Sequence, residues 1–453
     1  MDRKKLGALA LGAMIAAAAC TPGNGASSAP SASTGGEASP AGTETPATSA
    51  TAGTSKGGLL WIGASFPLSG GAAADGQPTV KGAQLAVDEI NAAGGVGGYT
   101  IQLEALDHAV NGKYNELQGA ADMKNFVSQP DVIGMVGPYN SAVAKVQIPI
   151  GNSAGLLQCS PANTNMSLTL PEFGAADYRK ANPDKNNYVR VAANDTIQGP
   201  AMADYDYNTL GLRNVLVVDD VTTFGKGVAD TFQKAFESYG GTVNRVGADK
   251  DTKDFNDIIT AAKAKNPDGV YYGGIVTSGG GLLLKQLRQQ GLTIPFTGPD
   301  GINNGSGKDK GSLFQVAGPE ASKNTFSTVA AIGDFPAKAD FDARFTKRFS
   351  GDADYNAPGS YSGPAYACTT IILDALKGVL AANPGADLAT IREGIRAWVT
   401  DPSHSFDTVL GKTTFDANGD TSQPYISFYS EDPAGADGTG AWKFVEQRNY
   451  AKP

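Results

Sequence analysis

The carboxylate of Asp300 stands in an unusual local sequence, PFTGPDGINN, directly after the short apolar run LTIPF. An acid placed at the end of a strand, between a proline and a glycine, could point into a cleft and pair with a cationic group of a ligand. Pro-Asp-Gly is also a common sequence of solvated turns. The local sequence leaves both interpretations open, so the rest of the chain has to decide between them.

Two other motifs that could carry chemistry are incomplete. In GSGKDKGS (305–312), Ile302 stands where a phosphate-binding loop needs its first glycine, and Asp309 replaces the Ser or Thr that would bind magnesium. FDANGD (415–420) resembles a calcium-binding loop, but its glycine comes one place early and Ser427 replaces the bidentate glutamate. We therefore expect a hairpin turn at FDANGD and neither a nucleotide nor a calcium site.

Composition excludes several classes of function. The chain has 453 residues and a formal net charge of −9, so we expect two domains and no nucleic-acid partner. Two distant histidines, His108 and His404, and the lack of a G-x-S-x-G elbow leave no nucleophile–base pair, metal site or cofactor site to be built, and we expect no enzyme. Cys159 and Cys368 could form a disulfide in an oxidising compartment, or could be two small buried hydrophobic residues.

The N-terminus has the pattern of a processed secretion signal. Basic residues at 3–5 precede an apolar run at 6–19, which is too short for a comfortable transmembrane helix. Ala17-Ala18-Ala19-Cys20 resembles a bacterial lipobox, which implies a signal peptide at 1–20 and an acylated Cys20; the alternative is a plain secretory signal. Residues 21–57, almost only Gly, Ser, Ala, Pro and Thr, predict a disordered tether. No later apolar stretch reaches about 18 residues, so we expect the remainder to be soluble and extracytoplasmic.

From residue 58 onward, short apolar runs alternate with amphipathic helical segments, which predicts parallel α/β sheets in two consecutive halves. In the first half we expect strands at 59–68, 99–107, 131–139 and 155–161, and helices at 79–95, 114–128 and 141–153. In the second half we expect strands at 214–219, 242–246, 268–274 and 292–298, and helices at 227–239, 255–265 and 280–290. Further segments then return: a strand at 324–332, helices at 361–380 and 388–399, and a hairpin at 408–430 around Asn418-Gly419.

Several motifs in one order resemble a known family. They are IGASFPLSGGAAADGQPTVKGAQLAVDEINAAGGVGG, IGMVGPYNSAVA, LLQCSPANTNMSLT, NDTIQGPAMADY, FGKGVADTF, DFNDIITAAKAKNPDGVYYGG and FTGPDG. Together they cover nearly all of residues 58–430. On these motifs the chain resembles the leucine/isoleucine/valine-binding type of type I periplasmic solute-binding proteins, which feed ABC importers.

This resemblance implies a fold of two Rossmann-like lobes joined by three crossovers. Lobe one is expected at 58–193 and 328–410, and lobe two at 194–327 and 411–453, the last segment being a C-terminal hairpin. The ligand is expected between the lobes at the carboxyl ends of the strands, as in other open parallel sheets. Hinge closure would then trap it.

In family members that bind α-amino acids, four matching positions contact the zwitterion. The resemblance implies that Ser141 binds the ligand carboxylate, and that Ala162, through its carbonyl, Thr164 and Asp300 bind the zwitterion and its ammonium group. The branched-chain binder of the family has a glutamate at the position of Asp300. Two alternatives remain: Ser141 could only cap the following helix, and Thr164 could only stabilise its own turn.

The chain departs from the branched-chain pattern around the expected ligand side chain. Phe224 and Ile275 each stand where the family binder has tyrosine, and Asp75 replaces a third tyrosine near the cleft rim. Tyr139 is bulkier than the usual leucine. Aliphatic ligands fit Phe224 and Ile275, whereas Asp75 could favour a polar or longer ligand, so the sequence leaves the ligand unidentified.

The sequence thus favours a lipid-anchored, amino-acid-binding subunit of an ABC importer on the extracytoplasmic face of a bacterial membrane. The expected partners are a permease, an ATPase and a small-molecule ligand. A sensory lipoprotein of the same fold is the alternative from another class. Amides, urea and aromatic acids remain as alternative ligands, and an extracytoplasmic hydrolase is disfavoured by the missing nucleophile–base pair.

Overall fold

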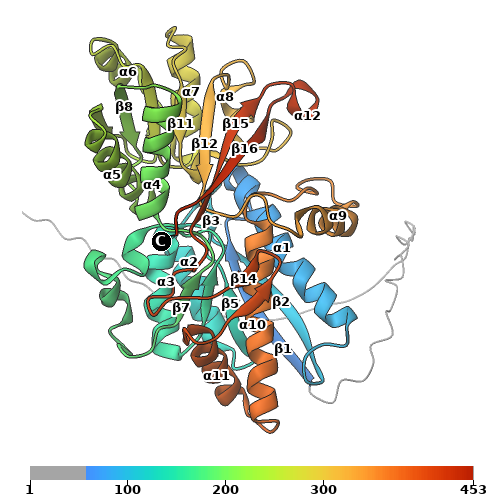
Figure 1. Ribbon diagram of the computed structural model, residues 1–453. Helices are drawn as coiled ribbons and strands as arrows, with labels where there is room; N and C mark the ends of the chain where they lie inside the picture. Colours follow the sequence, from blue (N-terminus) through green and yellow to red (C-terminus); the bar gives the residue numbers. More distant parts are fainter. Residues whose placement is uncertain (1–57, 452–453) are drawn as a thin grey trace, which may run out of the picture. The chain divides into compact units, whose positions relative to one another are not determined.

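The computed structural model describes residues 58–451. The predicted signal peptide at 1–20, Cys20 and the tether at 21–57 lie outside the described residues. Two separate β-sheets, each covered by helices on both faces, organise the described part of the chain (Figure 1). The sequence-based expectation of two α/β lobes is confirmed.

The first sheet has five strands in the order β2-β1-β5-β6-β7, all parallel. We call this sheet and its helices lobe 1. The strand predicted at 99–107 is confirmed residue for residue, the strands predicted at 59–68, 131–139 and 155–161 are confirmed at shorter length, and β7 was not predicted. The strands are β1 (Gly58–Phe66), β2 (Tyr99–Asp107), β5 (Val132–Val136), β6 (Gln158–Ser160) and β7 (Tyr188–Arg190).

Helices cover both faces of the first sheet, and glycines show how closely they pack. A Cβ atom on Gly63 of β1 would lie 2.8 Å from the ring of Phe126, on the face covered by α2 and α3. A Cβ atom on Gly134 of β5 would lie 3.2 Å from Ile372, on the face covered by α1, α10 and α11. The helices of lobe 1 are α1 (Ala73–Ala92), α2 (Glu116–Ser128), α3 (Ser141–Ala154), α9 (Lys338–Phe349), α10 (Ser362–Ala382) and α11 (Leu388–Thr400).

Helix α10 corrects one prediction. By length and composition it could cross a membrane, although the sequence reading found no further apolar stretch of that length. In the structure it packs along α1 and α11 and contributes Ile371, Ile372 and Leu376 to the core of lobe 1 (Figure 1). Helix α10 is therefore apolar because it is a core helix.

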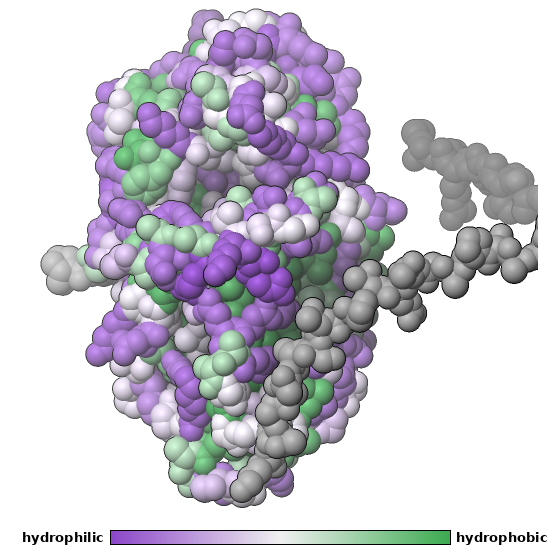
Figure 2. All heavy atoms as spheres, turned by 90° about the vertical axis from the view of Figure 1, so that its right-hand side faces the viewer, coloured by the Kyte–Doolittle hydropathy of each residue, from purple (hydrophilic) through white to green (hydrophobic). Residues whose placement is uncertain are grey.

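The face shown in Figure 2 carries mainly hydrophilic side chains, with hydrophobic ones in scattered patches.

The second sheet has seven strands in the order β16-β15-β12-β11-β10-β8-β9. We call this sheet and its helices lobe 2. The five strands β12, β11, β10, β8 and β9 are parallel to one another. Strands β15 and β16 add to the β12 edge in antiparallel pairs. The strands are β8 (Asn214–Asp219), β9 (Thr242–Gly247), β10 (Gly269–Gly273), β11 (Phe296–Gly298), β12 (Thr325–Val329), β15 (Tyr425–Asp432) and β16 (Ala441–Asn449).

Helices α4 and α5 cover one face of the second sheet, and α6, α7 and α8 belong to the hydrophobic core on the other face. Helices α4, α8 and α9 were not predicted, although Phe341, Phe345 and Phe349 form an apolar stripe along α9. The helices of lobe 2 are α4 (Asp195–Asp204), α5 (Thr223–Ser238), α6 (Asn256–Lys263), α7 (Gly280–Gln289), α8 (Leu313–Ala317) and the short α12 (Gly435–Gly438).

The chain passes between the lobes three times, after β7, after β12 and before β15. Two hydrogen bonds join these crossovers: the N–H of Ala193 donates to the carbonyl of Ala330 at 3.0 Å, and the amide of Asn194 donates to Asp420 at 2.9 Å. The crossovers therefore form one connected strap between the lobes.

The C-terminal pairing differs from the prediction of one hairpin around Asn418-Gly419. Instead β13 (Phe406–Thr408) pairs with β14 (Gly411–Thr413), and β15 pairs with β16 and β12. Asn418 and Gly419 form only a turn, closed by a single bridge between Phe415 and Thr421. Pro424, which lacks an N–H group, interrupts the ladder directly before β15, and the edge of the lobe 2 sheet supplies β15 with a longer partner.

Short elements complete the fold. A two-stranded ladder, β3 (Ala109–Val110) with β4 (Lys113–Tyr114), follows β2. A π-helical turn spans Tyr205–Thr209. Single turns of 3-10 helix lie at Gly70–Ala72, Met166–Leu168, Pro171–Phe173, Ala175–Arg179, Val276–Ser278 and Asp300–Ile302.

A disulfide joins Cys159 of β6 to Cys368 of α10, with their Cα atoms 5.6 Å apart. The two cysteines are both fully buried. Of the two alternatives left open by the sequence, the structure has the disulfide. The bond ties α10, which returns to lobe 1 after lobe 2, to the sheet formed by the first half of the chain.

Candidate functional site

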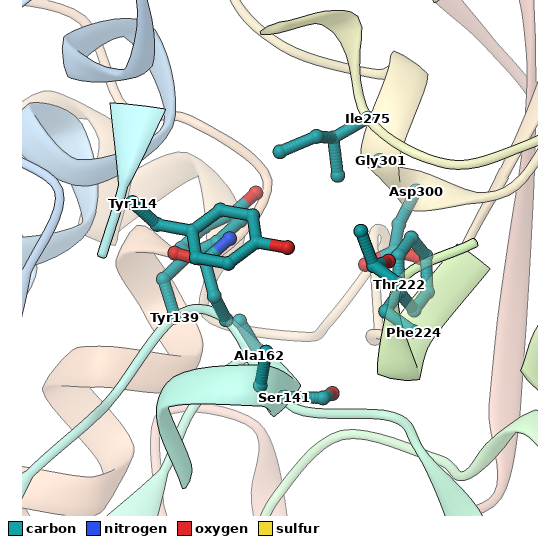
Figure 3. Close-up of a pocket in the computed structure, with 11 residues that line it drawn as sticks. Tyr114, Tyr139, Ser141, Ala162, Thr222, Phe224, Ile275, Asp300 and Gly301 are labelled. Atoms are coloured by element: carbon teal, nitrogen blue, oxygen red, sulfur yellow. The ribbon is translucent and has the colours of Figure 1, made fainter. Parts of the chain in front are cut away.

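A pocket lies where strands of both lobes end (Figure 3). Its lining follows β5, β6, β8, β10 and β11, as expected for a site at the carboxyl ends of parallel strands. Six of the predicted site residues line it, while Asp75 and Thr164 lie buried beside it. From lobe 1 the lining residues are Tyr114, Tyr139, Asn140, Ser141, Ala142 and Ala162. From lobe 2 they are Thr222, Phe224, Ile275, Asp300 and Gly301.

Asp300 is not a solvated turn residue. It opens the 3-10 turn that follows β11 and is 4% exposed. The amide of Gln198 donates to its Oδ1, and the hydroxyl of Tyr361 donates to its Oδ2, each at 2.7 Å. Burial raises the pKa of Asp300 to about 6, against the opposing effect of the hydrogen bonds from Tyr361 and Gln198. Two neutral donors thus hold this carboxylate at the pocket without neutralising it.

The glycine after Asp300 is required by space. A Cβ atom on Gly301 would lie 2.4 Å from the carbonyl oxygen of Gly274 and 2.8 Å from side-chain atoms of Ile275 and Phe224. Any larger residue would push these walls apart. The Asp-Gly sequence that resembled an ordinary turn therefore allows the close packing around the carboxylate.

Asp75, predicted near the cleft rim, lies buried beside the pocket. Helix α1 begins at Ala73, six residues before the predicted start, so Asp75 falls in its buried first turn with 6% exposure. The hydroxyl of Tyr139 donates to Asp75 Oδ1 at 3.5 Å. Burial and the negative charge of Asp300 raise the pKa of Asp75 to about 7. Two carboxyl groups from opposite lobes thus influence each other across the site.

A third carboxyl group beside the pocket, that of Asp195, was not predicted from the sequence. It is the first residue of α4, is fully buried, and donates its N–H to the carbonyl of Thr164 at 2.8 Å. The hydroxyl of Thr164 is close enough to the Asp195 carboxylate to oppose the rise of its pKa, and neither group has another hydrogen-bond partner among the described residues. Burial, followed by the charge of Asp300, raises the pKa of Asp195 well above its ordinary value. In sequence, NDTIQGP shows only a capped helix start, so nothing local distinguishes Asp195 and Gln198 from exposed first-turn residues.

Ser141 and Ala162 present backbone and hydroxyl groups to the pocket. Ser141 is the first residue of α3, whose N-cap is Asn140, so Ser141 does not cap the helix. Its Oγ accepts the N–H of Asn165 at 3.4 Å, which ties it to the loop that carries Ala162. The first N–H groups of a helix have no partner within the helix and favour an anion. This side of the pocket therefore suits a negative group.

Between these polar ends lies an apolar wall. Ile275, Phe224 and Tyr114 pack in one cluster with Ala142 and Val143. Figure 3 shows Tyr114 and Ile275 on the opposite side of the pocket from Ser141. The sequence reading missed Tyr114 because it placed this residue at the start of a helix, whereas Tyr114 ends β4. The site thus combines an acidic end, an end that favours anions, and a hydrophobic surface.

The periplasmic binding protein family model matches residues 60–434. The chain belongs to the periplasmic binding protein family. The Leu/Ile/Val-binding protein homolog 2 of Brucella abortus is 30% identical over 373 residues, which is 82% of this chain and 90% of that protein.

Solved structures of family members share the fold. A leucine-binding protein from Thermotoga maritima superposes with a TM-score of 0.69 at 24% identity, covering 86% of this chain and 99% of that one. A solute-binding protein from R. palustris in complex with 4-hydroxybenzoate also gives 0.69, at 19% identity, covering 87% of this chain and 98% of that one. The predicted family and type I periplasmic-binding fold are confirmed.

Membership of this family makes the protein an extracytoplasmic solute-binding protein. The lobes of this family member contact each other around the pocket. Tyr361 of lobe 1 donates to Asp300 of lobe 2, the amide of Asn165 donates to the carbonyl of Thr223 at 2.6 Å, and Lys113 forms an ion pair with Asp251 at 2.5 Å.

The raised pKa of Asp300 predicts how stability changes with pH. The folded state favours the protonated carboxyl, so its contribution is present below about pH 4 and is lost as pH rises through about 6. Without ligand, we expect the free energy of unfolding of the parent, relative to Asp300→Asn, to fall by about 2–3 kcal/mol between pH 4 and pH 7. Urea denaturation of both proteins at several pH values measures this difference.

Asp300→Asn removes one titrating carboxyl group together with its effect on the pKa of Asp75 and Asp195, so the difference measures Asp300 and this coupling. Asp257→Asn, at an exposed position of α6, is the matched control and should give no such profile. A difference between parent and Asp300→Asn that stays constant from pH 4 to pH 7 would contradict the burial of an ionisable Asp300.

Proposed function

We propose that the protein is the substrate-capturing subunit of an ABC importer and that its ligand is an α-amino acid with a branched or other aliphatic side chain. The curated relatives of similar length carry names of Leu/Ile/Val-binding and amino-acid-binding proteins. The fold alone does not decide the ligand, because a structural neighbour holds 4-hydroxybenzoate. The pocket of this chain therefore has to supply the argument.

The observation that carries the proposal is the buried Asp300, which faces a pocket with no Lys, Arg or His among its eleven lining residues. A buried carboxylate needs a cationic partner when it is ionised. The ammonium group of an amino acid supplies this partner, and the carbonyl of Ala162 and the hydroxyl of Thr164 accept its remaining protons.

The opposite end of the zwitterion has its own partners. The ligand carboxylate binds the hydroxyl and N–H of Ser141 at the first turn of α3, where the helix dipole favours negative charge. Both charges of the ligand then exchange water for fixed partners, which burial requires. The ligand side chain lies against Phe224, Ile275 and Tyr114, with Tyr139 and Asp75 at the border of this apolar wall.

Capture and delivery follow from the two-lobe arrangement. The ligand binds between the lobes, and bending at the three crossovers opens and closes the site. The closed form presents both lobes to a permease, whose ATPase drives import. An acylated Cys20, with residues 21–57 as a tether, keeps the protein at the extracytoplasmic membrane face.

A thermal-shift screen tests the proposal. Leucine, isoleucine and valine at about 100 times their Kd should raise the melting temperature by about 3–10 °C, since ligand that binds only the folded state stabilises it. Two leucine analogues serve as controls for the charged ends. Leucinamide lacks the carboxylate and 4-methylpentanoate lacks the ammonium, so each should give a much smaller shift.

Two results would overturn the amino-acid assignment. One is the absence of a shift with any α-amino acid. The other is an equal shift with leucine and 4-methylpentanoate, because a ligand without an ammonium group would leave Asp300 unpaired. Benzoates, urea and short amides belong in the same screen, and a response to them alone would assign the site to those ligands.

A further inference from the structure

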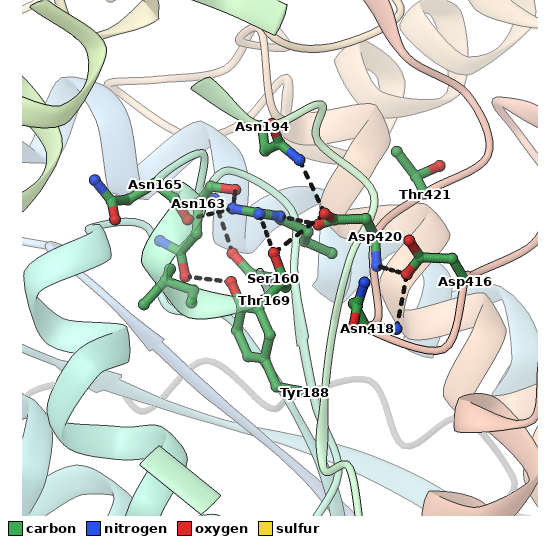
Figure 4. A network of polar contacts seen from close by, with 12 residues as sticks. Ser160, Asn163, Asn165, Thr169, Tyr188, Asn194, Asp416, Asn418, Asp420 and Thr421 are labelled. Atoms are coloured by element: carbon green, nitrogen blue, oxygen red, sulfur yellow. Dashed lines mark hydrogen bonds and ion pairs between the residues drawn. The ribbon is translucent and has the colours of Figure 1, made fainter. Parts of the chain in front are cut away.

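The FDANGD loop (415–420), whose sequence departs from the calcium-binding pattern, packs against lobe 1 (Figure 4). Asp416 orders this loop by accepting the N–H groups of Asn418 and Asp420, each at 2.9 Å. Gly419 has a φ of 94°, and a Cβ atom there would lie 2.2 Å from the carbonyl oxygen of Tyr188 in β7. The loop is therefore shaped to lie directly against the last strand of lobe 1.

The contact centres on Arg190, which is fully buried. Its Nε donates to Asp420 Oδ1 at 2.6 Å. Its other nitrogens donate to the carbonyls of Asn163 and Asn165, at 3.3 and 2.8 Å, and to the hydroxyl of Thr169. One guanidinium group thus joins the third crossover to the segment 163–169.

That segment lies behind the pocket wall and is hydrogen-bonded to residues that line it. Asn163 donates to the carbonyl of Tyr139 at 2.7 Å, and the N–H of Asn165 donates to the hydroxyl of Ser141 at 3.4 Å. Ala162, directly before it, lines the pocket. The side chain of Asn165 also reaches the carbonyl of Thr223 in lobe 2. A shift of this segment would move several pocket atoms at once.

Asp420 has a second set of contacts that leads to the hinge. Its Oδ2 accepts the amide of Asn194, in the first crossover, at 2.9 Å and the hydroxyl of Thr169 at 3.1 Å. The carboxylate therefore bridges the first crossover, the third crossover and the pocket segment. Arg190 is fully buried and the Asp420 side chain is 13% exposed, and a hydrogen-bonded network around such an ion pair favours one local geometry over others.

We propose that Arg190 and Asp420 are positioning residues of the ligand pocket. Through them the third crossover holds the segment 163–169, and Ala162 directly before it, in the geometry that binds ligand. The crossovers between the lobes are thereby coupled to the site. The affinity readout of this inference rests on the proposed function, whereas its structural readout needs no ligand.

Asp420→Asn is the test variant, because it keeps the shape of the side chain and removes its charge. Asp407→Asn, at an exposed position of β13 shortly before the same crossover, is the matched control. In the protein without ligand, we expect hydrogen exchange of the amides in 162–169 to become faster in Asp420→Asn, with parent-like exchange in β8 and β10 of lobe 2. General destabilisation would accelerate exchange in both regions.

The second readout is affinity for the amino acid that gives the largest thermal shift, measured by calorimetry well below the melting temperature. We expect Asp420→Asn to raise Kd about tenfold or more. Ser141→Ala should weaken binding by a smaller factor in the Asp420→Asn protein than in the parent. The reason is that Asp420→Asn already displaces Asn165, whose N–H donates to Ser141. If no amino acid binds the parent, the proposed function fails, and the exchange readout still decides this inference.

Parent-like exchange in 162–169, or an unchanged Kd in a folded Asp420→Asn protein, would overturn the proposal. If Asp420→Asn does not fold, Thr169→Val takes its place, since it removes the hydroxyl between Arg190 and Asp420 and keeps both charges. Faster local exchange in Thr169→Val would support the inference, and parent-like exchange with parent-like affinity would overturn it.

Discussion

Replacing Asp300 by asparagine should weaken binding of the amino-acid ligand about a hundred- to several-thousand-fold while the protein stays folded. The carboxylate is 4% exposed and is held by Tyr361 and Gln198, so it cannot turn away from a bound ammonium group towards water. Asparagine keeps the shape and removes the charge, which leaves a buried ammonium without its ionic partner. Such a loss costs about 3–5 kcal/mol. Isothermal titration calorimetry of both proteins measures it.

Two controls make this result specific. Asp257→Asn makes the same chemical change at an exposed position of lobe 2 and should leave Kd unchanged. For 4-methylpentanoate, which has no ammonium group, Asp300→Asn should bind no worse than the parent. Equal affinity of the parent and Asp300→Asn for the amino acid would show that Asp300 does not meet the ammonium.

The alternation of strands and helices could be predicted from sequence because each element carries its own signal. The strand predicted at 214–219 is β8 residue for residue, since its apolar run and its end are both local. The pairing of β15 with β12 could not be predicted, because it depends on the edge of a sheet built from segments about 100 positions away. Helix α10 shows the same limit: its apolar sequence fits a membrane or a core, and only its packing decides.

The site was predictable only in part for a similar reason. The motif around Asp300 marked it as a candidate, but its donors Gln198 and Tyr361 lie 102 and 61 positions away. Neither residue has a local pattern that distinguishes it from an ordinary helix start. Asp195 was missed because its special feature, a fully buried carboxyl group with a raised pKa, is a property of the folded interior. The sequence therefore indicated residues that belong to motifs and missed those that are defined by burial.

Removal of the Cys159–Cys368 disulfide should lower the free energy of unfolding by about 2–4 kcal/mol. The cysteines are 209 positions apart, so the bond closes a loop that includes most of lobe 2. The loss of chain entropy in the unfolded state grows with loop length, and for a loop of this size it sets an upper limit of about 5 kcal/mol, above the 2–4 kcal/mol that disulfides typically contribute. Urea denaturation with and without a thiol reductant measures the change, and the double variant Cys159→Ala, Cys368→Ala provides the permanently open form.

The reductant should leave the stability of the double variant unchanged, which separates the bond from other effects of the reagent. Unfolding midpoints of the parent that agree with and without reductant would contradict the prediction. Disulfides form and persist in oxidising compartments, so the stability of the protein should depend on the compartment in which it folds. The bond joins β6, in the first stretch of lobe 1, to α10, in the stretch that returns to lobe 1 after lobe 2. Reduced protein made in a cytoplasm lacks this link, so its free energy of unfolding should be lower. We therefore expect protein recovered from an oxidising compartment to unfold at the higher urea concentration.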